Sequence, residues 1–237
     1  MLFRSIPISL LLSFPGTPIM YYGDEIGMGD NIWLADRDGV RTPMQWSVDR
    51  NGGFSRCDPN KLHLPVNAGW VYGYQAVNVE RQIDQPDSLL QWTRRMVEIR
   101  KRYRALAQGT YEELPGSNPS VLSFLREYVN AEGDTETVLC VHNLSRHPQP
   151  VQLNLARRFH NNVPVELSGG TAFPNIGLRP YLLTLPGYGS YWFSIVPARQ
   201  TVPRARRKTV ADAVPGSHHR LDEQPTQVPM HTIERTQ

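Results

Sequence analysis

The sequence predicts two fold classes in one chain of 237 residues. Residues 1–109 are predicted to be α/β, and residues 110–197 are predicted to be all-β, as an antiparallel β-sandwich. The apolar run at residues 19–22 is bounded by proline and glycine, which is typical of a parallel strand buried on both faces. Residues 88–107 have helical periodicity, and about seven short segments separated by turn residues follow them.

The first 14 residues predict a helix that leads into this strand. Arg4 and the apolar run after it also resemble a secretion signal, but no small-residue cleavage site follows, and Pro15-Gly16 ends the run. No apolar run reaches the roughly 18 residues that a membrane span needs, so we expect no membrane contact. Residues 27–84 have little periodicity, and so long an irregular stretch in a compact protein is usually functional.

Residues 88–107 form the clearest helix in the sequence. Asp87 or Ser88 can cap its first turn, and Gly109 can end it. Its basic residues could form an anion site, but a solvated face whose cations favour the negative end of the helix explains them more simply. Its apolar residues recur at alternating spacings of three and four, at Leu89, Trp92, Met96, Ile99, Tyr103 and Leu106.

Turn-forming residues such as Pro115-Gly116 separate the strands that we expect in the all-β part. Residues 198–237 have four prolines and no aromatic residue. Such a segment can bury too little apolar area to offset the entropy lost on ordering, so we predict a disordered tail. The strands are predicted at residues 111–114, 121–128, 137–143, 151–155, 163–167, 181–185 and 190–196.

The net charge of +3 lies wholly in residues 198–237, which hold seven basic and four acidic residues. The first 197 residues are therefore neutral, which argues against a nucleic-acid surface. Cys57 and Cys140 give no disulfide framework, and no cysteine–histidine cluster has metal-ligand spacing. We expect a cytoplasmic protein with no metal and no other cofactor.

Two motifs carry the most specific information. GTPIMYYGDEIG at residues 16–27 predicts a strand and a glycine-rich loop, and DRDGVRTPMQW at residues 36–46 predicts a polar loop. Together they resemble the eighth-strand segment and the loop after it in the α-amylase superfamily (glycoside hydrolase family 13), whose catalytic domain is a (β/α)8 barrel. The wider segment at residues 28–55 and YGYQAVNVE at residues 72–80 narrow the resemblance to trehalose synthases, and it covers roughly residues 8–196.

The resemblance implies that residues 1–109 are the last βα unit of a (β/α)8 TIM barrel, with a long active-site loop and the final helix. It also implies a double displacement, in which one carboxylate attacks the anomeric carbon and a second carboxyl group protonates the leaving glucose. In the family these groups lie at the ends of earlier strands, which would precede residue 1. Asp24 and Glu25 are adjacent and would point to opposite sides of an extended backbone, so we expect no catalytic residue and no activity from this chain alone.

Arg41 is the first candidate for substrate binding. In related glucosidases the arginine of this motif lines the sugar pocket, and a guanidinium can donate to two hydroxyls. An ion pair within the loop, with Asp36 or Asp38, is the alternative. The other candidates are Arg37, Asp38, Gln45, which could instead be a loop-fixing amide, and Trp46, which could instead pack the loop against the barrel.

The sequence therefore predicts the C-terminal part of an enzyme similar to trehalose synthase, which interconverts maltose and trehalose. The resemblance implies that these sugars are bound only by a complete barrel, and that a separate chain could supply the earlier barrel strands. Two alternatives remain open: a part of an α-glucosidase or α-amylase of the same superfamily, and a non-catalytic β-sandwich that binds sugars or another protein.

Overall fold

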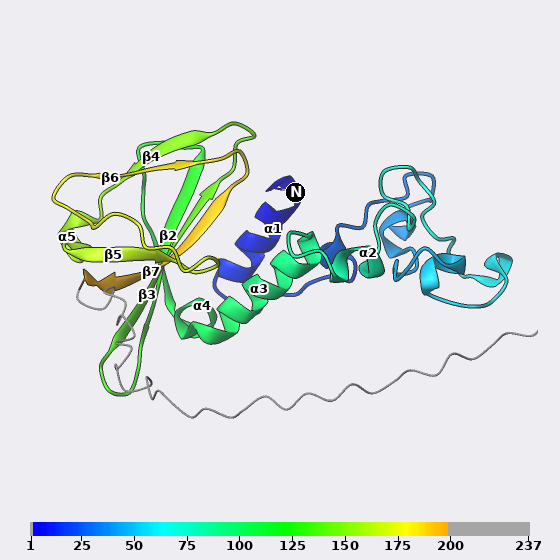
Figure 1. Ribbon diagram of the computed structural model, residues 1–237, viewed down its shortest axis with the longest axis horizontal. Helices are drawn as coiled ribbons and strands as arrows, with labels where there is room; N and C mark the ends of the chain where they lie inside the picture. The colour runs from blue at the N-terminus through cyan, green and yellow to red at the C-terminus, as the bar shows by residue number, and fades with distance from the viewer. Residues whose placement is uncertain (1, 199–237) are drawn as a thin grey trace, which may run out of the picture. The chain divides into compact units, whose positions relative to one another are not determined.

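The computed structural model describes residues 2–198, with side chains from Arg4 onward. All seven expected strands are present, and every neighbouring pair is antiparallel (Figure 1). Five strands form one sheet in the order β1-β2-β3-β7-β5, and β4-β6 form a second. The strands are β1 Thr110–Glu113, β2 Val121–Val129, β3 Thr135–Asn143, β4 Gln149–Leu153, β5 Asn162–Glu166, β6 Tyr181–Leu185 and β7 Ser190–Pro197. The disordered tail predicted from residue 198 onward lies outside the described residues, except for residue 198 itself.

The two sheets enclose an apolar core, which confirms the predicted sandwich. Alternate residues of β6 are buried, and Leu183 is paired with the buried Val151 of β4. From the larger sheet, Leu125, Leu139 and Phe193 enter the same core and are almost completely buried. A short helix, α5 (Ala156–Phe159), connects β4 to β5.

Three helices cover the other face of the larger sheet (Figure 1): α1 (Leu2–Ser13), α3 (Leu89–Arg102) and α4 (Arg104–Gln108). Phe124, Cys140 and Trp192 point to this side and are buried with the helices. Because the middle of β2 and most of β3 are covered on both faces, consecutive residues at 123–126 and 137–143 are all buried and do not show the alternation of a half-exposed strand.

The helix predicted at residues 88–107 is divided into α3 and α4 at Tyr103, which has an extended backbone. Ser88 caps α3 as expected, since its Oγ accepts a hydrogen bond from the Gln91 amide. The start of α4 is capped from a distant strand, where a Glu136 carboxylate oxygen accepts from the Ala105 amide at 2.6 Å. The break therefore depends on a tertiary contact, which helical periodicity does not reveal.

Serines spaced four residues apart place one face of α1 against the sheet. Ser9 Oγ lies 3.0 Å from His142 Nε2 of β3 and accepts a hydrogen bond from Trp192 Nε1 of β7 at 3.1 Å. Burial lowers the pKa of His142 to about 3 and raises that of the neighbouring Cys140, so both groups are neutral at pH 7. The N-terminal helix predicted from the sequence is thus confirmed and belongs to the folded core.

Residues 14–88 consist mainly of turns, and the parallel strand predicted at residues 19–22 is absent. Ile19 is 84% exposed, and the described residues offer no neighbouring parallel strand with which this segment could pair. The prediction was wrong because an apolar run becomes a buried parallel strand only between partners. The short elements here are η1 Asp24–Ile26, η2 Asp38–Arg41, η3 Arg50–Gly53, η4 Pro59–Lys61 and α2 Val79–Ile83, which lie near the end of α3 opposite α4 in Figure 1.

Candidate functional site

Backbone hydrogen bonds hold the loop that carries Arg41 and Trp46. The amides of Trp46 and Ser47 donate to the Gly52 carbonyl at 2.8 and 3.0 Å. Asn51 and Gly52 have φ values of 58° and 65°, a left-handed conformation that asparagine and glycine tolerate better than other residues. The carbonyl of Trp46 accepts from the amide of Glu80 at 2.9 Å, which ties the loop to α2.

A cavity of about 370 Å³ opens beside this loop. Tyr22 connects the two sequence motifs here, because its hydroxyl donates to the Thr42 carbonyl at 3.0 Å. Partial burial, together with the interaction with the neighbouring Tyr21 side chain, raises the pKa of Tyr22, so its hydroxyl remains protonated at neutral pH. The cavity is lined by Tyr22, Glu25, Arg41, Pro43, Met44, Trp46, Phe54, Leu62, His63 and Leu64.

Arg41 is the charged side chain most available to a ligand in this cavity. Its Nη1 lies 3.6 Å from an oxygen of Asp38, and both side chains are nearly half exposed. An exposed pair at this distance contributes little to stability, so the guanidinium can exchange it for other acceptors at small cost. The sequence offered sugar binding and an internal ion pair as alternatives, and the structure contains the ion pair while also placing Arg41 on the cavity wall.

The other predicted site residues have different positions. Trp46 lines the cavity and is half exposed. Gln45 is fully buried, and its Nε2 donates to the carbonyls of Val77 and, at 3.1 Å, of Tyr72, which is the loop-fixing arrangement. Asp38 contacts Arg41, whereas the exposed Arg37 is not among the residues that line the cavity.

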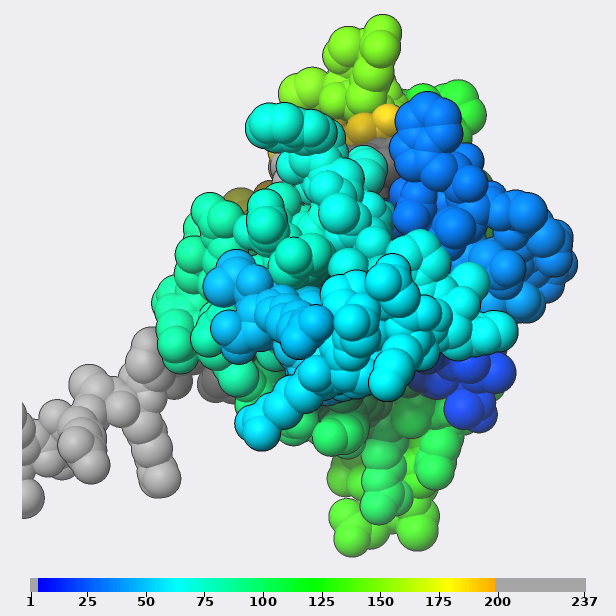
Figure 2. Space-filling model, turned by 90° about the vertical axis from the view of Figure 1, so that its right-hand side faces the viewer, coloured from blue at the N-terminus to red at the C-terminus, as the bar shows by residue number. Residues whose placement is uncertain are grey.

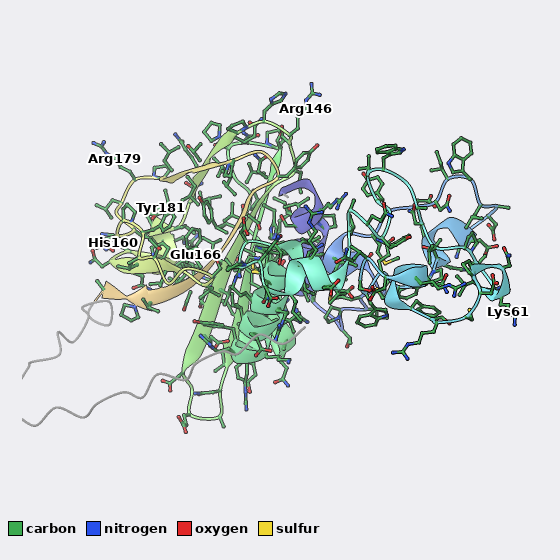
Figure 3. All side chains as sticks on the ribbon, turned by 45° about the vertical axis from the view of Figure 1, so that its right-hand side comes forward. Lys61, Arg146, His160, Glu166, Arg179 and Tyr181 are labelled. Atoms are coloured by element: carbon green, nitrogen blue, oxygen red, sulfur yellow. The ribbon has the colours of Figure 1, made fainter. Side chains whose placement is uncertain are left out.

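Phe54 and His63 complete the cavity and were not selected from the sequence as site residues. They come from an irregular segment in which no periodicity indicates which side chains converge, and their aromatic character was the available signal. Lys61, just before this wall, lies at the outer end of the loops (Figure 3). In the sandwich, by contrast, Arg146, His160, Glu166 and Arg179 are dispersed and form no common cluster in this view.

A second cavity, of about 510 Å³, lies between residues 30–33 and 66–72. These two walls are the blue and cyan protrusions that stand apart in Figure 2. Trp33 and Trp70 line it and are 88% and 99% exposed. In the described part of the chain, no three histidine, cysteine, aspartate or glutamate side chains are grouped in a way that could hold a metal ion.

Comparison with known proteins identifies the family. Residues 5–109 match the model of the α-amylase catalytic domain, and residues 111–192 match that of the maltogenic amylase C-terminal domain. The chain belongs to the α-amylase superfamily. It holds the end of the superfamily's catalytic barrel followed by the C-terminal β-sheet domain, as the fold described above indicates.

Trehalose synthases are among the relatives of this α-amylase superfamily chain. The enzyme from Pimelobacter sp. is 62% identical over 187 residues, and the trehalose synthase/amylase of Mycolicibacterium smegmatis is 59% identical over 191 residues. Each match covers 79% of this chain but 32% of the relative. The chain therefore spans about a third of the length of these relatives.

Solved structures of the superfamily share the fold. A trehalulose synthase is 26% identical with a TM-score of 0.63, over 81% of this chain and 38% of that chain. The isomaltulose synthase of Klebsiella sp. LX3 gives a TM-score of 0.62 at 23% identity, over 82% of this chain and 38% of that chain, and indicates the fold alone. Within residues 2–198, no helix combines the length and apolar character that crossing a membrane requires.

Proposed function

We propose that this chain supplies the end of the catalytic barrel, the Arg41 loop and the C-terminal sandwich to an enzyme that interconverts maltose and trehalose. The observation that carries this proposal is the 62% identity to a trehalose synthase over 187 residues, which are 79% of this chain. In the assembled enzyme Arg41 donates hydrogen bonds to hydroxyls of the substrate, and the half-exposed Trp46 offers a face on which a sugar ring stacks.

The cavity by itself does not support glucosyl transfer. A retaining mechanism needs two carboxyl groups about 5–5.5 Å apart on either side of the glycosidic bond. Among the described residues that line the cavity, Glu25 is the one carboxylate, and its Oε2 accepts a hydrogen bond from the Gly23 amide at 2.8 Å. The proposal therefore places the nucleophile and the acid/base in the part of the enzyme that this chain does not match.

The proposed partner of residues 16–72 is the earlier part of the barrel, in the same polypeptide or as a separate chain. Large apolar side chains are exposed here to an extent that is unusual for the surface of a soluble monomeric protein. An added strand beside residues 19–22 would pair with their backbone amides and carbonyls, and the other elements of the barrel would cover their side chains. The most exposed of these side chains are Ile19, Ile32, Trp33, Trp70 and Val71.

The purified chain alone should neither convert maltose to trehalose nor hydrolyse an aryl α-glucoside. Loss of the nucleophile and the acid/base removes many powers of ten in rate. Product formation measured over hours, against a heat-denatured control, tests this expectation. Turnover above the control that disappears in Glu25→Gln would contradict it, because the chain would then hold its own catalytic carboxylate.

A further inference from the structure

Arg100 of α3 and Arg126 of β2 are buried cations. Arg126 is 1% exposed and Arg100 8%, and neither lies within ion-pair distance of a carboxylate in the described residues. Burial lowers the pKa of both guanidinium groups, and for Arg126 the charge of Arg100 lowers it further. Buried cations without a carboxylate partner need strong hydrogen-bond acceptors to remain buried.

Their acceptors are backbone carbonyls at the C-terminal end of α1 and just beyond it. Arg100 donates to Leu12 at 2.5 Å and to Gly16 at 2.7 Å, while Arg126 donates to Ser13 at 2.6 Å. The last carbonyls of a helix have no partner within the helix and lie at its negative end, so they bind cations well. Arg126 also donates to Gly109 at 2.9 Å and to Thr110 at 3.0 Å, which fixes the connection between α4 and β1.

The carbonyls held in this way lie directly before the segment that enters the cavity. From Gly16 the chain reaches Tyr22 after six residues, and Tyr22 is bonded to Thr42 next to Arg41. Met20, between the two, packs against the buried cluster that α1 and α3 form with the sheet. The two arginines therefore fix one end of this short segment, and the Tyr22 hydrogen bond connects its other end to the Arg41 loop.

We propose that Arg100 and Arg126 are positioning residues for the candidate site: they hold the carbonyls of α1 and Gly16, and so set where Tyr22 and Glu25 enter the cavity beside Arg41. This inference rests on the proposed function in assigning the cavity to maltose and trehalose. It adds that the sandwich takes part in the site, because Arg126 contacts α1 from β2, a strand inside the larger sheet.

The first test uses hydrogen exchange on the full 237-residue chain. Arg100→Lys and Arg126→Lys keep the charge but replace a planar fork of donors by one ammonium, which cannot reach the same set of carbonyls. The amides of Ile26 and Met28 are informative because both donate to the Gly23 carbonyl. We expect exchange at these amides to become about tenfold faster in each variant, with exchange in β3 changed by less than about twofold.

Two matched controls separate positioning from general stabilisation. Arg95→Lys changes an exposed arginine of α3 that also donates to a carbonyl, that of Pro86, and Arg158→Lys changes an exposed arginine of the sandwich. Both controls should leave exchange at residues 26 and 28 unchanged. Unchanged exchange in Arg100→Lys and Arg126→Lys, or an equal increase throughout β3 and β7, would overturn the proposal.

The second test measures kinetics after the chain is joined to the preceding part of the Pimelobacter relative. Arg100→Lys should lower kcat for maltose by about tenfold while KM changes by less than about threefold, and Arg95→Lys should change neither. An unchanged kcat in Arg100→Lys would overturn the positioning role. If the joined wild-type enzyme is inactive, the proposed function fails, whereas the exchange experiment still decides whether the two arginines hold the segment.

Discussion

Arg41 and Gln45 belong to the same short motif but have different roles in the structure. Arg41 lies on the cavity wall with a weak, exposed ion pair, whereas Gln45 is fully buried and bonded to two backbone carbonyls. The sequence could indicate that the motif is polar and functional, but not which side chain turns inward. That choice depends on Tyr72 and Val77, which are 27 and 32 residues further along the chain than Gln45.

Arg41→Lys in the joined enzyme should reduce maltose turnover by about one to three powers of ten, or roughly 1.4–4 kcal/mol. The lysine retains the charge but loses the paired donors, and the melting temperature should be nearly unchanged because the residue is half exposed. Asp38→Asn is the matched control, since it removes the ion pair and leaves the guanidinium. An equal loss in both variants would reduce Arg41 to a loop-stabilising residue.

Gln45→Met should increase local opening of the loop and leave the stability of the sandwich unchanged. The substitution leaves the carbonyls of Tyr72 and Val77 without these donors, at a cost of about 1–3 kcal/mol, or roughly 5- to 150-fold in local opening. The amide of Val79 donates to the Gln45 carbonyl, so its hydrogen-exchange rate reports the change. The exposed Gln75→Met serves as the control, and equal rates in the two variants would show that the buried amide does not fix the loop.

At the scale of elements, local sequence patterns predicted correctly those helices and strands whose boundaries are set by their own residues. The seven strands and α3 are accompanied by turn residues and a serine cap, and the structure contains them all. The strand at residues 19–22 failed because the described residues offer it no parallel neighbour, and the break at Tyr103 was missed because it depends on Glu136. The packing of α1 on the sheet was also missed, because the apolar Ile8 and Leu12 share this contact with Ser9 and Ser13, whose polar side chains give no hydrophobic signal.

The contact between α1 and the sheet should make the chain sensitive to acid through His142. Its pKa is about 3 in the folded chain, against an ordinary value of 6.5, so below pH 6.5 the unfolded chain binds a proton that the folded chain does not. The contribution of His142 to the free energy of unfolding should be fully present above pH 6.5. It should fall by about 1.4 kcal/mol per pH unit as the pH decreases from 6.5 towards 3.

Urea unfolding between pH 7 and pH 4 measures this dependence. His142→Gln removes the titrating group and should flatten the decline in unfolding free energy, whatever its stability at pH 7. His147→Gln, at an exposed position, should retain the wild-type slope. Identical slopes for wild type and His142→Gln would mean that His142 is not held neutral in the fold.

At the scale of the whole molecule, the sandwich and its helices form a buried core, while residues 16–72 expose large apolar side chains around two cavities. Both features are explained if the chain completes a larger enzyme of the α-amylase superfamily. The two motifs were sufficient to indicate this family from sequence, because their residue types are specific. The complete cavity wall was not predictable, since Phe54 and His63 reach it from an irregular segment.

The most direct test of the central claim joins this chain to the preceding part of the Pimelobacter relative and supplies maltose labelled with 13C. The account predicts labelled trehalose, detected by NMR, from the joined enzyme and none from either part alone. A joined protein that elutes as a folded, monodisperse species but forms no trehalose would contradict the account. Release of labelled glucose in place of trehalose would instead assign the chain to a hydrolase of the same superfamily.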